Sequence, residues 1–186
     1  MISYNRKSIR LKDYDYSSNG AYFVTICTQD REMLFGSVGV DPRVDPVNPC
    51  MQLNDVGKMV GDWWLKIADK YPGIELDVYQ IMPNHIHGIV IINGWTHHSI
   101  GRTHRSAPTI GTIIQWFKTM ATNEYIKNVK QSHWPPFNKR VWQRNYFEHI
   151  IRNDIELNKI REYIVNNPQT WDRDRNNPNE SGKINS

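Results

Sequence analysis

The pattern of hydrophobic and polar positions in the first half of the chain predicts an alternation of strands and helices. Residues 21–28 follow a Ser-Ser-Asn-Gly turn and are rich in β-branched and aromatic residues, which predicts a first strand. From residue 53 the apolar positions recur at helical spacing, and this predicted helix ends near Lys70, before a Tyr-Pro-Gly turn. Residues 74–82 and 85–93 predict two more strands, joined by a tight turn at Met-Pro-Asn.

The second half continues the alternation. Residues 109–129 carry an apolar stripe at helical spacing, and residues 140–151 predict a fourth strand. A last helix begins after Asn153, a residue suited to an N-cap, and ends before Pro168. The order of strands and helices predicts an α+β fold, in which a ferredoxin-like antiparallel sheet has helices on its faces and an extra C-terminal helix.

Four segments fall outside this predicted core. Residues 5–12 form a basic N-terminal arm, and residues 38–50 contain three prolines and predict an irregular insertion. Residues 94–108 predict a second, polar insertion. The chain after residue 170 is polar and contains proline, which predicts a flexible tail. We therefore expect a single domain over residues 1–170, followed by a tail over residues 171–186.

Composition and charge narrow the choice of partners and of compartment. With 186 residues, 39% of them hydrophobic, the chain is long enough to bury a core. The 23 basic and 19 acidic residues give a net charge of +4, which permits a nucleic-acid partner without requiring one. Cys27 and Cys50 have no Cys-x-x-Cys partner, and no signal peptide or membrane span is evident. We therefore expect a cytoplasmic protein without a membrane partner.

Two histidines are the most informative polar residues. His85 and His87 stand two residues apart at the start of an apolar run, so in a strand both side chains point to the same face. Two neighbouring imidazoles can hold one metal ion. For an isolated His-x-His pair we favour the alternative of two ordinary histidines at the mouth of a strand, because the pattern is short.

The last predicted helix carries a tyrosine that changes this balance. Tyr163 and Asn167 share one face of the helix with two isoleucines, a spacing that by itself indicates a structural tyrosine. If this helix packs over the histidine face of the sheet, Tyr163 and Asn167 come close to His85 and His87. A tyrosine hydroxyl beside a metal can attack phosphorus, but with an ordinary pKa of about 10 it needs a cation, an acceptor or a metal to assist it.

Five motifs in order along residues 5–168 resemble those of the REP-associated tyrosine transposases, a branch of the single-tyrosine transposases of the HUH endonuclease superfamily. They cover residues 14–16, 20–28, 82–90 with the His-hydrophobe-His pair, 142–152 and 160–168. The resemblance implies a sequence-specific endonuclease and strand transferase that acts on single-stranded DNA.

The resemblance also assigns roles to residues. It implies that His85 and His87 bind Mg²⁺ or Mn²⁺, that the metal polarises the scissile phosphate, and that Tyr163 attacks phosphorus to give a 5′-phosphotyrosine and a free 3′-hydroxyl. Asn167 takes the place of a third, amide ligand, with Asn166 as the alternative because a residue before proline avoids helical geometry. A purified sample can carry Zn²⁺ or Ni²⁺ instead, since these ions prefer imidazole. Tyr146 is the rival nucleophile, but its place on the predicted fourth strand favours a structural role.

Basic and aromatic residues interleave over residues 130–144, as suits single-stranded or hairpin DNA, because cations contact phosphates and rings stack on unpaired bases. The resemblance implies that this DNA comes from palindromic repeats. For each basic run the alternative to DNA binding is a solvated surface. The alternative for Trp142 is a core anchor of the fourth strand, and the alternative for Lys118 is a side chain that only extends its charged end to solvent. Arg102 and Arg105 form a third basic patch. The candidate DNA contacts are Arg6, Lys7, Arg10, Lys12, Lys118, Lys139, Arg140, Trp142 and Arg144.

Further histidines and functions remain to be weighed. His149 either lines the cleft or is an ordinary strand-edge histidine, which we favour slightly, whereas His97, His98 and His104 fall in the polar loop. A protein that binds DNA hairpins without transposition would not need both histidines and the tyrosine. A small metal hydrolase acting on nucleotides would not need the basic segments. The sequence leaves open whether the protein is a monomer or a homodimer.

Overall fold

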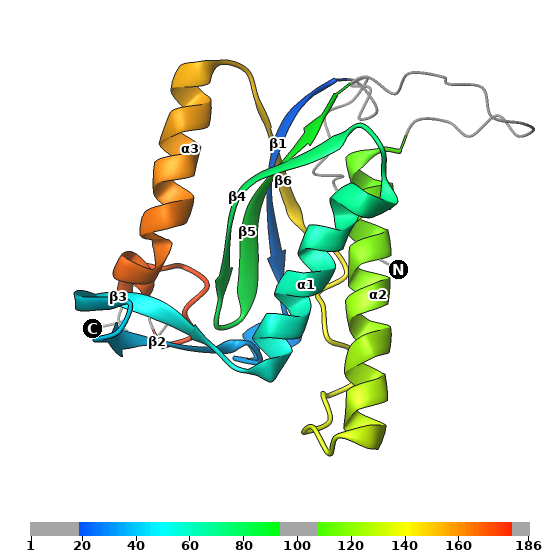
Figure 1. Cartoon of the computed structure of the whole chain (residues 1–186), viewed down its shortest axis with the longest axis vertical. Helices are drawn as coiled ribbons and strands as arrows, with labels where there is room; N and C mark the ends of the chain where they lie inside the picture. Colours follow the sequence, from blue (N-terminus) through cyan, green and yellow to red (C-terminus); the bar gives the residue numbers. More distant parts are fainter. Residues whose placement is uncertain (1–18, 94–107, 180–186) are drawn as a thin grey trace, which may run out of the picture.

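A four-stranded antiparallel sheet forms the centre of the molecule, and helices cover both of its faces (Figure 1). The computed structural model describes residues 19–93 and 108–179. Helices α1 (Asp55–Lys70) and α2 (Ile110–Gln131) pack on one face, and α3 (Asp154–Asn166) lies on the other. The strand order is β4-β5-β1-β6, with β1 at Gly20–Cys27, β4 at Ile74–Met82, β5 at His85–Ile92 and β6 at Phe147–Ile151. This is the order of a ferredoxin-like core, so the predicted fold class is confirmed.

Each of the three α-helices begins at a polar residue that caps it. The side chain of Asn54 accepts a hydrogen bond from the backbone N–H of Gly57, and Thr109 and Asn153 cap α2 and α3 in the same way. These caps satisfy backbone N–H groups that have no partner within the first turn of a helix. The helices consequently begin within two residues of the positions that the sequence predicts.

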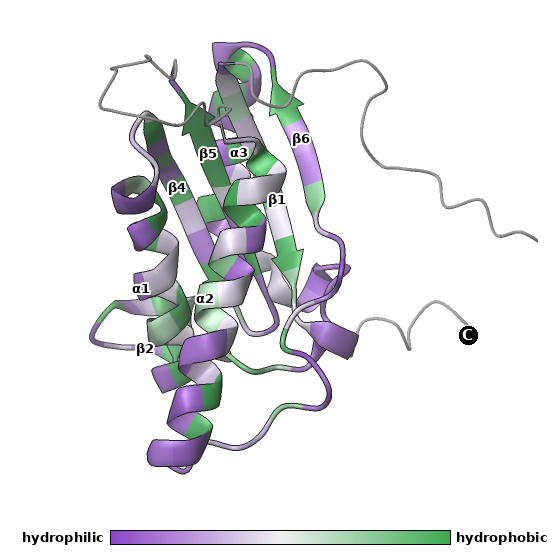
Figure 2. Ribbon diagram, turned by 90° about the vertical axis from the view of Figure 1, so that its right-hand side faces the viewer, coloured by the Kyte–Doolittle hydropathy of each residue, from purple (hydrophilic) through white to green (hydrophobic). Residues whose placement is uncertain are grey.

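The larger hydrophobic core lies between the sheet and helices α1 and α2. Figure 2 shows the strongly hydrophobic β5 in the middle of the sheet, between β4 and β1. Gly88 of β5 faces this core, and a Cβ built on it would lie 2.4 Å from Cζ2 of the fully buried Trp64. A residue without a side chain is therefore required for the indole of α1 to lie against the strand.

Helix α3 is attached to the opposite face by a much smaller core and by two polar contacts. The Nε of Arg161 donates to Oδ2 of Asp77 in β4 at 2.8 Å, and Nε2 of His149 in β6 lies 2.7 Å from Oε1 of Glu156. These contacts hold the helix against both edges of the sheet, over a small apolar cluster that consists of Phe23, Ile89, Ile151 and Ile164.

A β-hairpin replaces the irregular insertion that the prolines of residues 38–50 predict. Strands β2 (Gly36–Asp41) and β3 (Asp45–Leu53) form a separate two-stranded sheet that extends beside the end of α3 (Figure 1). Pro46 and Pro49 lie at a register shift and are not among the paired residues. Because each strand of a two-stranded sheet has a free edge, it tolerates residues without an N–H, and the prediction of an irregular segment was wrong.

Strand β6 is shorter than the predicted fourth strand. It begins at Phe147, and residues 140–146 contribute only an isolated bridge between Trp142 and Thr28. This segment crosses the end of β1, where the N–H of Gln143 donates to the carbonyl of Cys27. The predicted start at residue 140 was therefore wrong, because backbone contacts around the end of β1 replace a continuous ladder.

The chain beyond residue 170 packs against the domain, unlike the predicted flexible tail. A 3-10 helix, η2 (Asn167–Arg173), follows α3 directly. The other 3-10 helix of the described residues, η1 (Gln29–Arg31), lies after β1. Three polar residues after η2, Asp174, Asn176 and Asn177, are buried. The short side chains of Asp174 and Asn177 bind local backbone groups, which a purely polar composition does not reveal. The packed structure therefore extends past the predicted boundary at residue 170, to at least residue 179.

Several predicted features lie outside the described residues. These are the basic arm with Arg6, Lys7, Arg10 and Lys12, the motif at residues 14–16, residues 94–107 of the second insertion, and the chain from residue 180. Within the part that the structure describes, no helix is both long enough and apolar enough to cross a membrane.

Candidate active site

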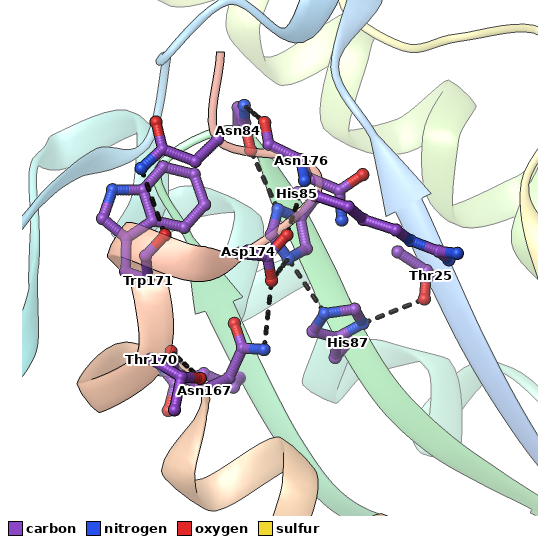
Figure 3. A network of polar contacts seen from close by, with 12 residues as sticks. Thr25, Asn84, His85, His87, Asn167, Thr170, Trp171, Asp174 and Asn176 are labelled. Atoms are coloured by element: carbon purple, nitrogen blue, oxygen red, sulfur yellow. Dashed lines mark hydrogen bonds and ion pairs between the residues drawn. The ribbon is translucent and has the colours of Figure 1, made fainter. Parts of the chain in front are cut away.

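His85 and His87 lie on the same face of β5, as their spacing predicts (Figure 3). Both side chains are buried, and their Nε2 atoms are 2.9 Å apart. Two nitrogen lone pairs at this distance repel each other unless a proton or a cation lies between them. Either a proton shared between the rings or a bound cation accounts for this distance.

Neighbouring polar side chains set the orientation of both rings. Asn84 donates through Nδ2 to the carbonyls of Arg31 and Asn176, so its Oδ1 faces Nδ1 of His85 at 2.8 Å and must accept a proton from it. On His87, Nδ1 lies 2.9 Å from the hydroxyl of Thr25. The Asn84 contact leaves Nε2 of His85 unprotonated in the neutral ring, as a metal ligand must be.

Burial favours the neutral form of both imidazoles. Burial, with a smaller contribution from the guanidinium groups of Arg175 and Arg31, lowers the pKa of His85 to about 3. Burial and the neighbouring His85 also hold the pKa of His87 well below its ordinary value. Both histidines are consequently neutral at pH 7, which is the state that coordinates metal ions.

Asp174 completes a group of three side chains that can hold a divalent metal ion. One ligand atom from each of His85, His87 and Asp174 lies within 4.8 Å of the other two (Figure 3). Among residues 19–93 and 108–179, no lysine or arginine forms an ion pair with this buried carboxylate, and its nearest basic group is Nε2 of His85 at 3.9 Å. Buried charges in proteins are paired or bind metals, so the donor set fits a cation.

Asn167 also points into this group. It is buried, its Nδ2 donates to Oδ2 of Asp174 at 3.2 Å, and its Oδ1 has no hydrogen-bond partner within the described part of the chain. Although it precedes Pro168, Asn167 has helical angles (φ −58°, ψ −40°), and the proline falls in the first turn of η2, where no N–H is required. Asn167, rather than the alternative Asn166, is thus the amide that contacts the site.

Tyr163 projects from α3 over the histidine pair. Its hydroxyl oxygen lies 3.3 Å from Nε2 of His87, and its ring packs edge-on against both His87 and Phe23. The side chain is 46% exposed, so a ligand can reach it from solvent. Partial burial and the carboxylate of Asp174 raise the pKa of Tyr163, whereas the guanidinium of Arg175 acts in the opposite direction.

The rival tyrosine occupies a different environment. Tyr146 precedes β6, and its hydroxyl donates to Oε2 of Glu148 at 2.7 Å. The hydroxyl of Tyr163, by contrast, lies 3.3 Å from Nε2 of His87. The structure therefore brings Tyr163 to the histidines, and it places Tyr146 just before β6, not within the strand as the sequence predicts.

Three of the predicted DNA contacts are exposed near the same end of the sheet. Lys139, Arg140 and Arg144 lie in the segment that crosses the end of β1, next to Gln143. Since Cys27 at that end pairs with His85, the basic segment and the metal-binding group share one end of the sheet. This placement leaves their side chains accessible to a nucleic acid that reaches the tyrosine.

Two predicted DNA contacts are structural. Lys118 is buried, and its Nζ donates to the carbonyls of Gln143 and Asn145 at 2.9 and 3.1 Å. Trp142 is buried in the larger core, where its ring packs against Phe35, which directly precedes β2, and against Phe117 of α2. Neither side chain is available to a phosphate or a base, so the core-anchor alternative holds for Trp142 and the DNA-contact prediction for Lys118 was wrong.

His149 links the sheet to α3 and does not line the histidine pair. It is paired across the ladder with Phe23 and contacts Glu156 in the first turn of α3. This position corresponds to the strand-edge alternative. The other histidines weighed from sequence, His97 and His98 together with His104, lie outside the described residues.

The sequence missed several residues that build the site. Asp174 and Arg175 fall in the predicted tail, about ninety positions from the histidines, so no local spacing connects them. Asn84 occupies the predicted turn, where asparagine is common for reasons of backbone geometry alone. Its position directly before His85 was the one available signal, because a side chain there can reach the neighbouring imidazole.

Comparisons with known proteins agree with these motifs. No family model matches the chain. It is 39% identical over 182 residues to an uncharacterised protein of Haemophilus influenzae, covering 92% of the chain and 93% of that protein. It is 25% identical over 162 residues to another H. influenzae protein, provisionally named a REP-associated tyrosine transposase, covering 83% of the chain and 73% of that protein.

The fold gives a further comparison. The solved structure of a REP-associated tyrosine transposase bound to a REP hairpin superposes with a TM-score of 0.52 at 17% identity, covering 86% of this chain and 73% of that one. This likeness shows a shared fold. The chain therefore has the fold of a REP-associated tyrosine transposase and is similar in sequence to a protein provisionally named as one.

Proposed function

We propose that this protein is a metal-dependent, sequence-specific single-stranded DNA endonuclease and strand transferase, a transposase that acts through a 5′-phosphotyrosine on Tyr163. One observation carries the proposal: the hydroxyl of Tyr163 lies 3.3 Å from Nε2 of His87, beside a buried group of metal-binding side chains. A nucleophile beside such a group is the arrangement that phosphoryl transfer to a side chain requires.

The chain offers four side chains to a divalent ion. His85, His87 and Asp174 would hold it, and Oδ1 of Asn167, which is buried without a partner among the described residues, is available as a fourth ligand. When bound, a Mg²⁺ or Mn²⁺ ion would neutralise charge on a phosphodiester and make its phosphorus more electrophilic. The carboxylate and amide oxygens suit these hard ions, whereas the imidazoles also suit Zn²⁺ or Ni²⁺, which a purified sample can carry.

Tyr163 performs the covalent step in this proposal. Its oxygen forms a bond to phosphorus as the bond from phosphorus to the 3′-oxygen breaks, and the departing 3′-oxygen takes up a proton. The phenol must lose its own proton, which partial burial and Asp174 oppose and the positive charge of Arg175 favours. In the joining step, a free 3′-hydroxyl attacks the phosphotyrosine and releases Tyr163.

The exposed basic segment would hold the DNA backbone. The solved REP-associated tyrosine transposase with a similar fold is bound to a REP hairpin. This similarity supports single-stranded or hairpin DNA from palindromic repeats as the substrate of this chain. Lys139, Arg140 and Arg144 are exposed beside the site, and each phosphate contact changes the slope of log affinity against log salt by roughly 0.7–0.9. Replacing all three by alanine should make that slope shallower by about two units. The arm at residues 5–12, a cytoplasmic location and a monomeric or homodimeric state remain predictions.

A cleavage assay tests the proposal. A labelled hairpin oligonucleotide with single-stranded tails is incubated with the protein and Mn²⁺, and covalent adducts are separated on a denaturing gel. We expect the wild type and Tyr146→Phe to form the adduct, and Tyr163→Phe, His85→Ala and chelator-treated protein to form none. Binding without cleavage by the wild type would instead favour the alternative of a DNA-hairpin-binding protein that retains the fold without transposition activity.

A further inference from the structure

A small pocket of about 180 Å³ opens beside the histidine pair. Thr25 of β1 lies on its floor and is paired with His87 on one side and with Phe147 of β6 on the other. The pocket therefore lies next to His87 along the row of side chains that crosses the sheet. Phe147 is two strand spacings from His87, on the order of 10 Å.

An exposed aromatic ring and a cation line this pocket. Phe147 is 40% exposed, although it is a large apolar side chain, and its ring packs edge-on against Phe23. The guanidinium of Arg175 lies 5.8 Å from the centroid of the Phe147 ring. A ring held at a fixed orientation beside a guanidinium is a platform on which an unpaired base can stack.

Amide side chains line the rest of the pocket. Gln143, Asn145 and Asn176 contribute to its walls, and amides can both donate to and accept from the edge of a base. The Nδ2 of Asn176 is buried and has no hydrogen-bond partner in the described parts of the chain. An unpaired buried donor is costly, and an acceptor on a ligand in the pocket would offer it a partner.

We propose that this pocket binds one unpaired base of the DNA strand, in the nucleotide next to the scissile phosphate, stacked on Phe147 beside Arg175. The inference rests on the proposed function and deepens it, because it assigns part of the sequence specificity to the protein itself. The volume is below the several hundred cubic ångströms of most ligand pockets, which suits a single base better than a whole nucleotide.

Binding measurements with abasic DNA test this pocket without requiring cleavage. The probe is a fluorescent hairpin oligonucleotide with mixed-sequence single-stranded tails, and each tail nucleotide in turn is replaced by an abasic one. For the wild type we expect one position at which base removal weakens binding by roughly 5- to 150-fold, the range for stacking of one base on an aromatic side chain. In Phe147→Ala, removal of the same base should change affinity less than twofold.

Two control variants separate stacking from a general loss of structure. Phe147→Trp retains an aromatic face and should keep the sensitivity to base removal, and Ile155→Ala removes a 71% exposed apolar side chain of α3 and should behave as the wild type. Equal sensitivity of the wild type and Phe147→Ala at every position would overturn the proposal. The readout is affinity, so equal sensitivity of the two proteins can be observed even if the protein cleaves DNA normally. Failure to form the tyrosine adduct, in contrast, would count only against the proposed function.

Discussion

Replacing Gly88 by alanine should destabilise the protein through a single steric overlap. The added Cβ would lie 2.4 Å from Cζ2 and 3.0 Å from Cη2 of Trp64. The indole is fully buried and packs edge-on against Phe117, so it has no room to retreat. Overpacking of a core typically costs about 1–3 kcal/mol, and we expect the upper end, about 3 kcal/mol, in the free energy of unfolding. For a chain of this length that loss lowers Tm by about 6–12 °C.

Urea denaturation of a small set of variants measures this effect. Gly20→Ala is the matched control, because its nearest neighbours would be at 3.8 Å and its change should stay within about 0.5 kcal/mol. Trp64→Phe removes the atoms that Cβ would meet, so Gly88→Ala should cost at least about 1 kcal/mol less in that background. The same cost of Gly88→Ala in both backgrounds would refute the packing of Trp64 against β5.

Three further predictions concern the site and its supports. Asp174→Asn should keep the fold but weaken Mn²⁺ binding at least about tenfold, seen as a smaller rise of Tm with added metal. Lys118→Met should lower stability by about 1–3 kcal/mol because two carbonyls lose their donor, yet leave the salt slope of DNA binding unchanged. Burial lowers the pKa of Lys118 to about 8 in the folded protein. Above that pH the unfolded chain therefore binds more protons than the folded protein does. The stability of the wild type relative to Lys118→Met should consequently rise from pH 8 to pH 10. Arg161→Ala removes the partly exposed pair with Asp77 and should cost under about 1 kcal/mol in stability while slowing adduct formation.

The helices and the central strands could be predicted because their signals are local. Asn54, Thr109 and Asn153 cap the three α-helices, and the apolar positions between caps recur at helical spacing. The two histidines likewise face the same way because alternation in a strand is a property of the backbone. These features depend on residues within a few positions of one another.

The errors come from contacts that the local sequence does not encode. Proline argues against a strand in general, because it has no N–H to donate. Pro46 and Pro49 nevertheless lie in a two-stranded hairpin, at positions that are not paired with the other strand, so no hydrogen bond between the strands is lost. In the sequence Asp174 is an ordinary tail residue, and only folding places it beside His85, 89 positions earlier in the chain. Lys118 is buried and donates to two backbone carbonyls, and Trp142 packs against Phe117, so contacts distant in sequence remove both side chains from the surface.

The nucleophile shows the limit of reasoning from spacing alone. Periodicity indicates a structural Tyr163, and only the resemblance to a transposase family assigns it a chemical role. The structure adds the 3.3 Å contact with His87, which neither the helical period nor the composition contains. The position of α3 over the histidines, held by Arg161 and Glu156, is what connects the two motifs.

Mass-spectrometric mapping of the covalent DNA adduct tests the central claim most directly. The protein is incubated with the hairpin oligonucleotide and Mn²⁺, digested with a protease and a nuclease, and the modified peptide is sequenced. The account predicts a single nucleotide linked through its 5′-phosphate to the oxygen of Tyr163. A modification on Tyr146, a linkage through a 3′-phosphate, or cleavage without any tyrosine adduct would contradict it.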